Sequence, residues 1–415
     1  MGATLSCCGP PHASVEHWCA LGGEELEEAI NKGWVALLRS EYIVKLASQG
    51  KSLCRRQEMP SNAYVGLGEL QTWRARVEIE INKTRSCQEA LPVVVVSYPW
   101  LQPSHPDPFG ETLQVLAAAL SRLRKVGVVL DFTALYQDPP GGKRTTEEKE
   151  KFDKGLNSLN SFYSHPNTFV FKVTDFPSDY PSEKYELPPG ANTRPYLERA
   201  WCFAEAAMSG LVKQSALVWD VSRQSEHERP APLTCEEFNK QLSTKKFTTP
   251  KGDAGRVRGL YKSAFENRIE KATELDFQGL QWDAQEGEKL ANALRRNTSL
   301  EALNLKGNRL RNAGITKLSE SLRTCSELRE LKLAGNDIGD AGAKSLARVL
   351  TSLKKLETLD MSFNEFLSDA GASSLAKALK DHTSFKLLKI SMCAIRGDAD
   401  LSAVPGRVEM DNDIF

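Results

Sequence analysis

Residues 300–310 read Leu-Glu-Ala-Leu-Asn-Leu-Lys-Gly-Asn-Arg-Leu, and their pattern recurs along the C-terminal third of the chain. The same spacing of apolar residues and one asparagine returns at 328–338 and at 356–366, each time after 28 residues. A fourth copy follows after 29 residues at 385–395, where Cys393 takes the asparagine position. A degenerate first copy is visible in Leu275, Phe277 and Trp282. A fixed period of this length indicates a repeat architecture in which each copy stacks on the next.

Each copy predicts a short strand followed by a helix. Apolar residues two apart place one face of a strand in the core, and the asparagine side chain can bond backbone groups that the following turn leaves unpaired. A second set of leucines at helical positions faces the same core, namely Leu290, Leu318, Leu346, Leu375, Leu294, Leu322, Leu350 and Leu379. The pattern resembles the ribonuclease-inhibitor type of leucine-rich repeat over residues 271–396, which implies an α/β leucine-rich-repeat solenoid.

The resemblance implies a concave strand face that binds a protein partner. Charges of both signs alternate among the outward positions, which argues against a track for the phosphates of RNA or DNA. Phe363 and Met392 are apolar there, and we interpret them either as a protein-contact hot spot or as a cover for the last repeat of a short array. The residues predicted to bind a partner are Lys306, Glu330, Lys332, Asp360, Phe363 and Met392.

Upstream of the repeats, the chain alternates β-branched runs with helical patterns. The run of four valines at 93–96 is typical of a strand buried on both faces, and further runs occupy 128–132, 168–173 and 216–220. This alternation predicts parallel βαβ units and an α/β fold class with a parallel sheet. Residues 24–49 are read as helices. The expected organisation is an anchor segment at 1–20, a helical region at 21–90, the α/β domain at 91–222, a helical connector at 223–270, the repeats at 271–400 and an acidic tail at 401–415.

Two motifs in this domain stand out. The helix after the third strand carries Trp201-Cys202-Phe203-Ala204-Glu205, and the first strand ends in Ser97-Tyr98. In this order they resemble a Toll/interleukin-1-receptor (TIR) domain over about residues 91–222. Two features depart from that family: a proline-rich insertion before the helix, and the lack of a clear fifth strand after residue 222.

The resemblance implies a site in the cleft at the strand ends, where open α/β sheets bind ligands. In NAD-cleaving members the glutamate of this run is catalytic, which here is Glu205, because an adjacent anion stabilises the oxocarbenium character that develops as the glycosidic bond breaks. The residues expected to line the cofactor-binding crevice are Ser97, Tyr98, Trp100 and Trp201. The alternative is that Glu205 belongs to a solvated helix face together with Glu198, Cys202 and Ser209.

The N-terminus carries an acylation pattern. After removal of Met1, Gly2 offers its amine and Ser6 occupies the position that N-myristoylation favours. One myristoyl chain binds membranes only marginally, so a second signal is needed, and Cys7 and Cys8 are candidate palmitoylation sites. The sequence therefore predicts a protein anchored by lipid on the cytoplasmic face of a membrane.

Composition excludes several other classes. Lys plus Arg and Asp plus Glu both number 54, so the average charge draws the chain neither to nucleic acid nor to an anionic membrane. The nine cysteines are dispersed and show no zinc-ligand spacing, so no metal is expected. We expect a membrane-anchored signalling or scaffold protein without a cofactor. The alternative from another class is an NAD-cleaving hydrolase with NAD as its substrate.

Overall fold

The computed structural model describes residues 5–6, 15–81, 84–123, 125–223, 225–226, 229–247 and 253–410. The chain divides into two compact units. The first holds residues up to Ser209 together with Lys213–His227 and Asn239–Tyr261, and the second holds Gly210–Val212, Glu228–Phe238 and the chain from Lys262 onward. The predicted boundary at residue 90 is absent from this division, because residues 21–90 and most of the α/β domain share the first unit.

Within the described residues, the first unit is built on a seven-stranded sheet with the order β10-β9-β8-β6-β7-β2-β3. The four predicted strands form its parallel centre: β6 (Val93–Ser97), β7 (Gly127–Val129), β8 (Phe169–Lys172) and β9 (Val218–Asp220). In chain order these four lie 2-1-3-4 across the sheet. The order reverses between β6 and β8, which is the switch point at which doubly wound sheets bind ligands.

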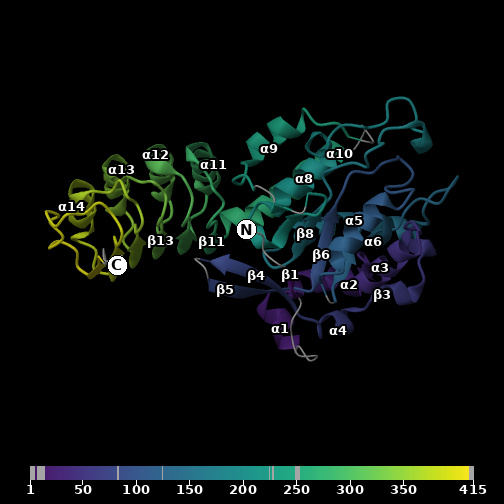
Figure 1. The fold of residues 1–415 in the computed structure, drawn as a ribbon, viewed down its shortest axis with the longest axis horizontal. Helices are drawn as coiled ribbons and strands as arrows, with labels where there is room; N and C mark the ends of the chain where they lie inside the picture. The colour runs from purple at the N-terminus through teal and green to yellow at the C-terminus, as the bar shows by residue number, and fades with distance from the viewer. Residues whose placement is uncertain are drawn as a thin grey trace. The chain divides into compact units, whose positions relative to one another are not determined.

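Helices cover both faces of this sheet (Figure 1). On one face, Val94 and Val96 of β6 share a core with α3 (Ser40–Ser48) and α5 (Glu111–Leu120). Alternate strand residues such as Val93 and Val95 are also fully buried, and they point to the opposite face. That face carries α7 (Thr146–Ser164) and α8 (Ala200–Ser209), which explains why the strands read as continuous apolar runs.

The helical prediction for residues 21–90 is wrong in part. The segment 24–49 gives α2 (Glu24–Asn31) and α3, but Leu37–Arg39 between them is strand β2, which pairs antiparallel with β7. Both leucines of β2 are buried, and a three-residue strand is too short to break the helical spacing of its neighbours. The same region also holds α1 (Val15–Ala20), β3 (Tyr64–Val65), α4 (Leu67–Leu70) and the hairpin of β4 (Ala75–Ile81) and β5 (Thr84–Ala90), to which β1 (Leu5–Ser6) adds a third strand.

A short fifth strand does follow residue 222. It is β10 (Ser225–Glu226), which pairs antiparallel with β9 and so does not extend the parallel set. The predicted helical connector contains α9 (Cys235–Leu242), α10 (Asp253–Phe265) and a π-helical turn at Glu266–Glu270. The remaining short helix of the first unit is α6 (Asp131–Ala134), directly after β7.

The second unit is the predicted repeat array, a parallel sheet whose strands are each followed by a helix (Figure 1). Its strands are β11 (Glu274–Asp276), β12 (Ala302–Asn304), β13 (Glu330–Lys332), β14 (Thr358–Asp360), β15 (Leu387–Lys389) and β16 (Arg407–Glu409). Its helices are α11 (Ala284–Leu294), α12 (Arg311–Leu322), α13 (Asp340–Leu350) and α14 (Asp369–Leu379). The helix leucines and the degenerate first copy predicted from the sequence are buried.

The repeat asparagines act as predicted. The Asn336 Nδ2 donates to the carbonyl oxygens of Leu305 at 2.8 Å and of Leu333 at 3.1 Å, which links two repeats. Asn308 and Asn364 make the equivalent bonds. At the fourth position the weaker Cys393 thiol reaches the Met361 carbonyl oxygen at 3.4 Å. The ladder therefore satisfies buried carbonyl groups that the turns leave open.

A second ladder was not predicted from the sequence. The Asp340 Oδ1 accepts hydrogen bonds from the backbone amides of Ser368 at 2.9 Å and Gly371 at 3.1 Å, at the start of the next repeat's helix. Asn312 does the same for Gly339 and Gly342. These side chains satisfy amides at helix starts, which have no partner within their own helix.

Two predictions within the array are corrected. The spacing at 356–366 predicts that Phe366 lies in the core, but this residue is 67% exposed and Leu367 fills the position instead. The extra residue in this copy shifts the register by one, so the aromatic ring turns to solvent. The predicted acidic tail from residue 401 is also structured in part, because β16 pairs parallel with β15 and continues the sheet.

Candidate functional site

The predicted catalytic residue Glu205 lies at the carboxyl end of the central strand β6. It is only 9% exposed, and its Oε2 accepts a hydrogen bond from the Ser97 hydroxyl at 2.5 Å. Ser97 follows Val93 and Val95 on the face that α8 covers, so strand alternation aims it at this helix. The Ser97 oxygen also lies 2.6 Å from the Tyr196 hydroxyl oxygen. The structure thus brings Glu205 to the switch point.

Burial has the largest effect on the pKa of the Glu205 carboxyl group. Loss of solvent raises the pKa of Glu205 to about 8, and the hydrogen bond from Ser97 offsets this effect only in part. The nearby carboxyl group of Asp131 raises the pKa of Glu205 further. At neutral pH the protonated, neutral form of Glu205 is therefore favoured, so this carboxyl group is not a fixed negative charge.

Asp131, which lies inside the strand run at 128–132, is a further residue of this site that the two sequence motifs do not include. Its Oδ1 accepts a hydrogen bond from the Tyr98 hydroxyl at 2.8 Å, and its Oδ2 accepts one from the Trp100 indole nitrogen at 2.9 Å. Burial raises the pKa of Asp131 as well. The signal that could identify it is its place two residues after β7, since polar residues at the carboxyl ends of parallel strands gather at one edge.

Of the other residues predicted to line the crevice, Tyr98 and Trp100 lie near Ser97, whereas Trp201 contacts another helix. Tyr98 and Trp100 bind Asp131, as above, and so lie in the same region as Ser97. Trp201 is not among the partners of Glu205, Ser97 or Asp131: its indole N–H donates to Asp253 of α10 at 3.2 Å. The alternative of a solvated helix face is wrong, because Glu205, Cys202 and Ser209 are buried and only Glu198 is exposed.

The segment at 174–199, here called the strap, lies against this site; it contains the proline-rich insertion, which ends at Pro195, and the turn that follows it. Tyr196 belongs to it and reaches Ser97. The Arg199 Nη1 donates to the Trp100 carbonyl oxygen at 2.6 Å, and the Gln102 Nε2 donates to the Tyr185 carbonyl oxygen at 2.5 Å. Arg199 and Tyr196 are themselves buried. The strap therefore ties the loop after β6 in place and helps to bury Glu205.

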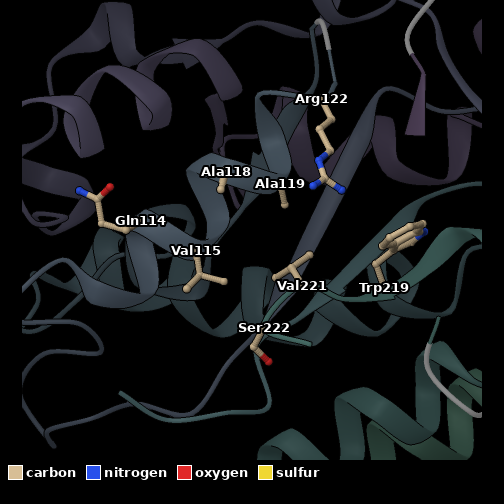
Figure 2. Close-up of a pocket in the computed structure, with 8 residues that line it drawn as sticks. All are labelled: Gln114, Val115, Ala118, Ala119, Arg122, Trp219, Val221 and Ser222. Carbon is tan, nitrogen blue, oxygen red and sulfur yellow. The ribbon is translucent and has the colours of Figure 1, made fainter. Parts of the chain in front are cut away.

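A surface groove lies elsewhere on the first unit (Figure 2). It has a volume of about 330 Å³ and runs between α5 and the end of β9. Its lining is Gln114, Val115, Ala118, Ala119, Arg122, Trp219, Val221 and Ser222, and none of these is a predicted site residue. Valine, alanine and tryptophan side chains form most of it, with Arg122 at one end (Figure 2).

The strand register assembles the predicted partner-binding residues on the repeat sheet. Lys332 lies between Asn304 and Asp360 in one outward row, and Glu330 lies between Ala302 and Thr358 in the other. The Lys332 ammonium group is 2.9 Å from the Glu330 carboxylate, so these two charges are paired. Lys306 and Asp360 make no ion pair with any residue that the structure describes. The face therefore offers charges of both signs to a partner.

Phe363 and Met392 follow strands β14 and β15 in the loops that lead to the next helix. Phe363 is 54% exposed, and Met392 is half-buried. Both have a left-handed backbone, with φ of 58°. The same conformation occurs at Gln281, Arg311 and Asp337 of the repeat loops, but these residues are polar. Phe363 and Met392 combine the strained backbone with an apolar side chain.

The predicted lipidation residues Gly2, Cys7 and Cys8 lie outside the described residues. Across the described ranges, no helix is long and apolar enough to cross a membrane. The same ranges contain no group of three or more His, Cys, Asp and Glu side chains placed to hold a metal ion.

Comparison with known proteins identifies the repeats. Residues 296–319, 324–347 and 352–376 match the leucine-rich repeat family. The chain thus carries leucine-rich repeats, as the spacing of 300–310 predicts. Among solved structures, an internalin (inlF) from Listeria monocytogenes is similar at 12% identity and a TM-score of 0.23, over 90% of this chain and 95% of that one. Comparison with curated proteins gives no match.

Proposed function

We propose that this protein is a membrane-anchored signalling scaffold that binds a protein partner through the concave face of its leucine-rich repeats. The observation that carries the proposal is the register of the repeat sheet, which lines up two rows of outward side chains across β11 to β16. Mixed charges with unpaired members such as Lys306 and Asp360 favour a protein surface over a nucleic acid.

The first unit is proposed to be a TIR-like module, and the N-terminus its lipid anchor. The strand order 2-1-3-4 supports the former, together with Ser97 and Glu205 meeting at the switch point. The pattern of Gly2, Ser6, Cys7 and Cys8 supports the latter. In this proposal the anchor fixes the module at a membrane while the repeats recruit the partner.

A charge-reversal experiment tests the role of the concave face. Proteins bound to the full chain in cells are compared for the wild type, for Asp360→Lys and for Glu236→Lys, a control on α9 outside the repeats. The proposal expects one set of partners to be lost from Asp360→Lys and kept by the control. Identical partner sets for all three proteins would remove the concave face as the binding surface.

Cleavage of NAD is the second candidate function, and the position of Glu205 favours it. The carboxyl group lies at the switch point beside Ser97, where a ligand of an open α/β sheet would sit. Two features limit this candidate: Tyr196 of the strap helps to bury the group, and the raised pKa keeps it neutral at pH 7. A neutral carboxyl group cannot stabilise a developing oxocarbenium ion by charge.

Cleavage of NAD by Glu205 would have a specific pH dependence. Incubation of the purified chain with NAD should release nicotinamide faster at pH 9 than at pH 7, because Glu205 loses its proton at about pH 8. Glu205→Gln should abolish the release at both values. Absence of nicotinamide at pH 9 would rule the candidate out for the isolated protein.

A further inference from the structure

A column of equivalent residues runs across the loops that follow the repeat strands. Its members are Gly279, Gly307, Gly335, Phe363 and Met392, here called the loop column, and all have a left-handed backbone with φ between 58° and 69°. Neighbouring members are linked through the backbone, since the amide of each of the first four donates to a carbonyl oxygen of the next repeat. An added Cβ on Gly307 would lie 3.8 Å from the Gly279 Cα, so the column is continuous.

The two halves of the loop column differ in side chain but not in backbone. Glycine adopts this conformation without steric cost, whereas phenylalanine and methionine do so at roughly 1 kcal/mol or more each. Phe363 keeps more than half of its surface in solvent, so burial does not repay that cost. The interpretation of Phe363 as a cover for the end of the array fails for the same reason, and β16 already covers β15.

A second exposed aromatic ring comes from the same loop. The one-residue insertion in the third copy turns Phe366 outward, where it is 67% exposed, and its backbone packs near Gly339 of the preceding loop. Phe363 and Phe366 are thus the two most exposed large aromatic side chains among the described residues. Two exposed rings within four residues of one loop offer a partner more apolar surface than a single exposed side chain does.

The charge around these two rings is mostly acidic, whereas the loop at 306–311 beside Gly307 carries Lys306, Arg309 and Arg311. The loops at 336–340, 363–369 and 391–400 contain six acidic residues, Asp337, Asp340, Glu365, Asp369, Asp398 and Asp400, and a single basic one, Arg396. Asp340 and Asp369 are engaged with backbone amides, whereas Glu365 is exposed and forms no ion pair with a described residue. A partner that covers the aromatic rings must therefore accept negative charge beside them.

We infer that the loop column is a docking track for an extended segment of a partner protein. The apolar side chains of this segment pack on Phe363 and Phe366, and its basic side chains face the acidic loops beside these two rings. Repeats stack about 5 Å apart, so five members span roughly 20 Å, the length of about six extended residues. The glycine half lets a backbone approach closely, and the aromatic half supplies the apolar contact. This inference rests on the proposed function. It specifies which edge of the array binds the partner and what chemistry the bound segment carries.

The test uses the full chain and two fluorescent peptides. One alternates lysine with leucine and the other alternates glutamate with leucine, and binding is followed by fluorescence anisotropy. The lysine peptide is expected to bind, and the glutamate peptide at least tenfold more weakly. Phe363→Gly and Phe366→Ser should each weaken the lysine peptide about tenfold, while Leu197→Ser, a matched change at an exposed residue of the first unit, should leave it unchanged.

Phe363→Gly also separates docking from a structural role. Because glycine suits the left-handed backbone, this variant should melt at or above the wild-type temperature even as it loses the peptide. A lowered melting temperature with unchanged binding would overturn the inference, as would equal binding of both peptides or binding of neither. A loss confined to Asp360→Lys would also overturn it, but would leave the concave face, and with it the proposed function, in place.

Discussion

A buried carboxyl group is held at the centre of the first unit by three aligned elements. Strand β6 supplies Ser97, helix α8 supplies Glu205, and the strap supplies Tyr196. The hydrogen bond from Ser97 satisfies one carboxyl oxygen, so burial does not leave the group without a partner. Because the neutral form is the cheaper one to bury, the site is most stable with its proton on.

Glu205→Gln should flatten the pH dependence of stability. An unfolded glutamate loses its proton near pH 4.5, whereas native Glu205 keeps it up to about pH 8. The native state binds more protons between these values, so stability falls as pH rises through this window. Each unit of pKa difference between the native and unfolded states corresponds to about 1.4 kcal/mol, so the free energy of unfolding should fall by on the order of 4 kcal/mol by pH 9. Denaturant unfolding at pH 5, 7 and 9 should show the wild type losing stability relative to the variant.

The control for this measurement is Glu198→Gln, because Glu198 is exposed in the same region. The stability of this variant should change with pH in parallel with that of the wild type. If the free energy of unfolding of Glu205→Gln also changed in parallel with that of the wild type at all three pH values, Glu205 would be ionised in the native state. The description of a buried, protonated carboxyl group would then be wrong.

Periodicity determines which helices and strands the sequence predicts. The repeat leucines and the strand of four valines were predicted because each pattern repeats or fills a whole element. Strand β2 was missed, since Leu37 and Leu38 also fit the helical spacing around them. Phe366 was misplaced because an insertion of one residue has two possible alignments, and only packing chose Leu367. Asp131 went unnoticed since its partners, Tyr98 and Trp100, come from a different strand end.

Leu333→Asp should unfold the repeat array cooperatively. Leu333 is fully buried just after β13, where an unpaired charge costs several kcal/mol, which approaches the whole stability of a domain. Each repeat stabilises its neighbours, so the loss should spread along the array. Hydrogen exchange should show loss of protection in β12 to β15 together.

The matched control is Leu387→Asp. Leu387 carries the same side chain on an outward position of β15, between Thr358 and Arg407, so the new charge meets solvent and a cation. Its protection should remain near that of the wild type. Equal loss of protection in both variants would mean that the inward and outward faces of the strands have been assigned wrongly.

The balance of charge over the chain limits how a membrane could hold it. Basic and acidic residues both number 54, so no net positive charge supports attachment to anionic lipid. The described residues contain no helix able to cross a bilayer. In the proposed function, attachment therefore depends on the acyl groups predicted at Gly2 and at Cys7 or Cys8.

Gly2→Ala should move the protein from the membrane fraction to the soluble fraction. N-myristoylation requires glycine at this position, and each acyl chain contributes about 0.8 kcal/mol per buried methylene group. A single chain gives only marginal binding, so Cys7→Ser combined with Cys8→Ser should also release the protein, although Gly2 is intact. Fractionation of cells that express the wild type, Gly2→Ala or the double cysteine variant measures the share of protein on the membrane. Ala3→Gly serves as a neighbouring control that keeps Gly2. Both variants remaining with the membrane would show that lipid does not anchor this chain. Release by the cysteine changes alone would assign the anchor to palmitoylation without myristoylation.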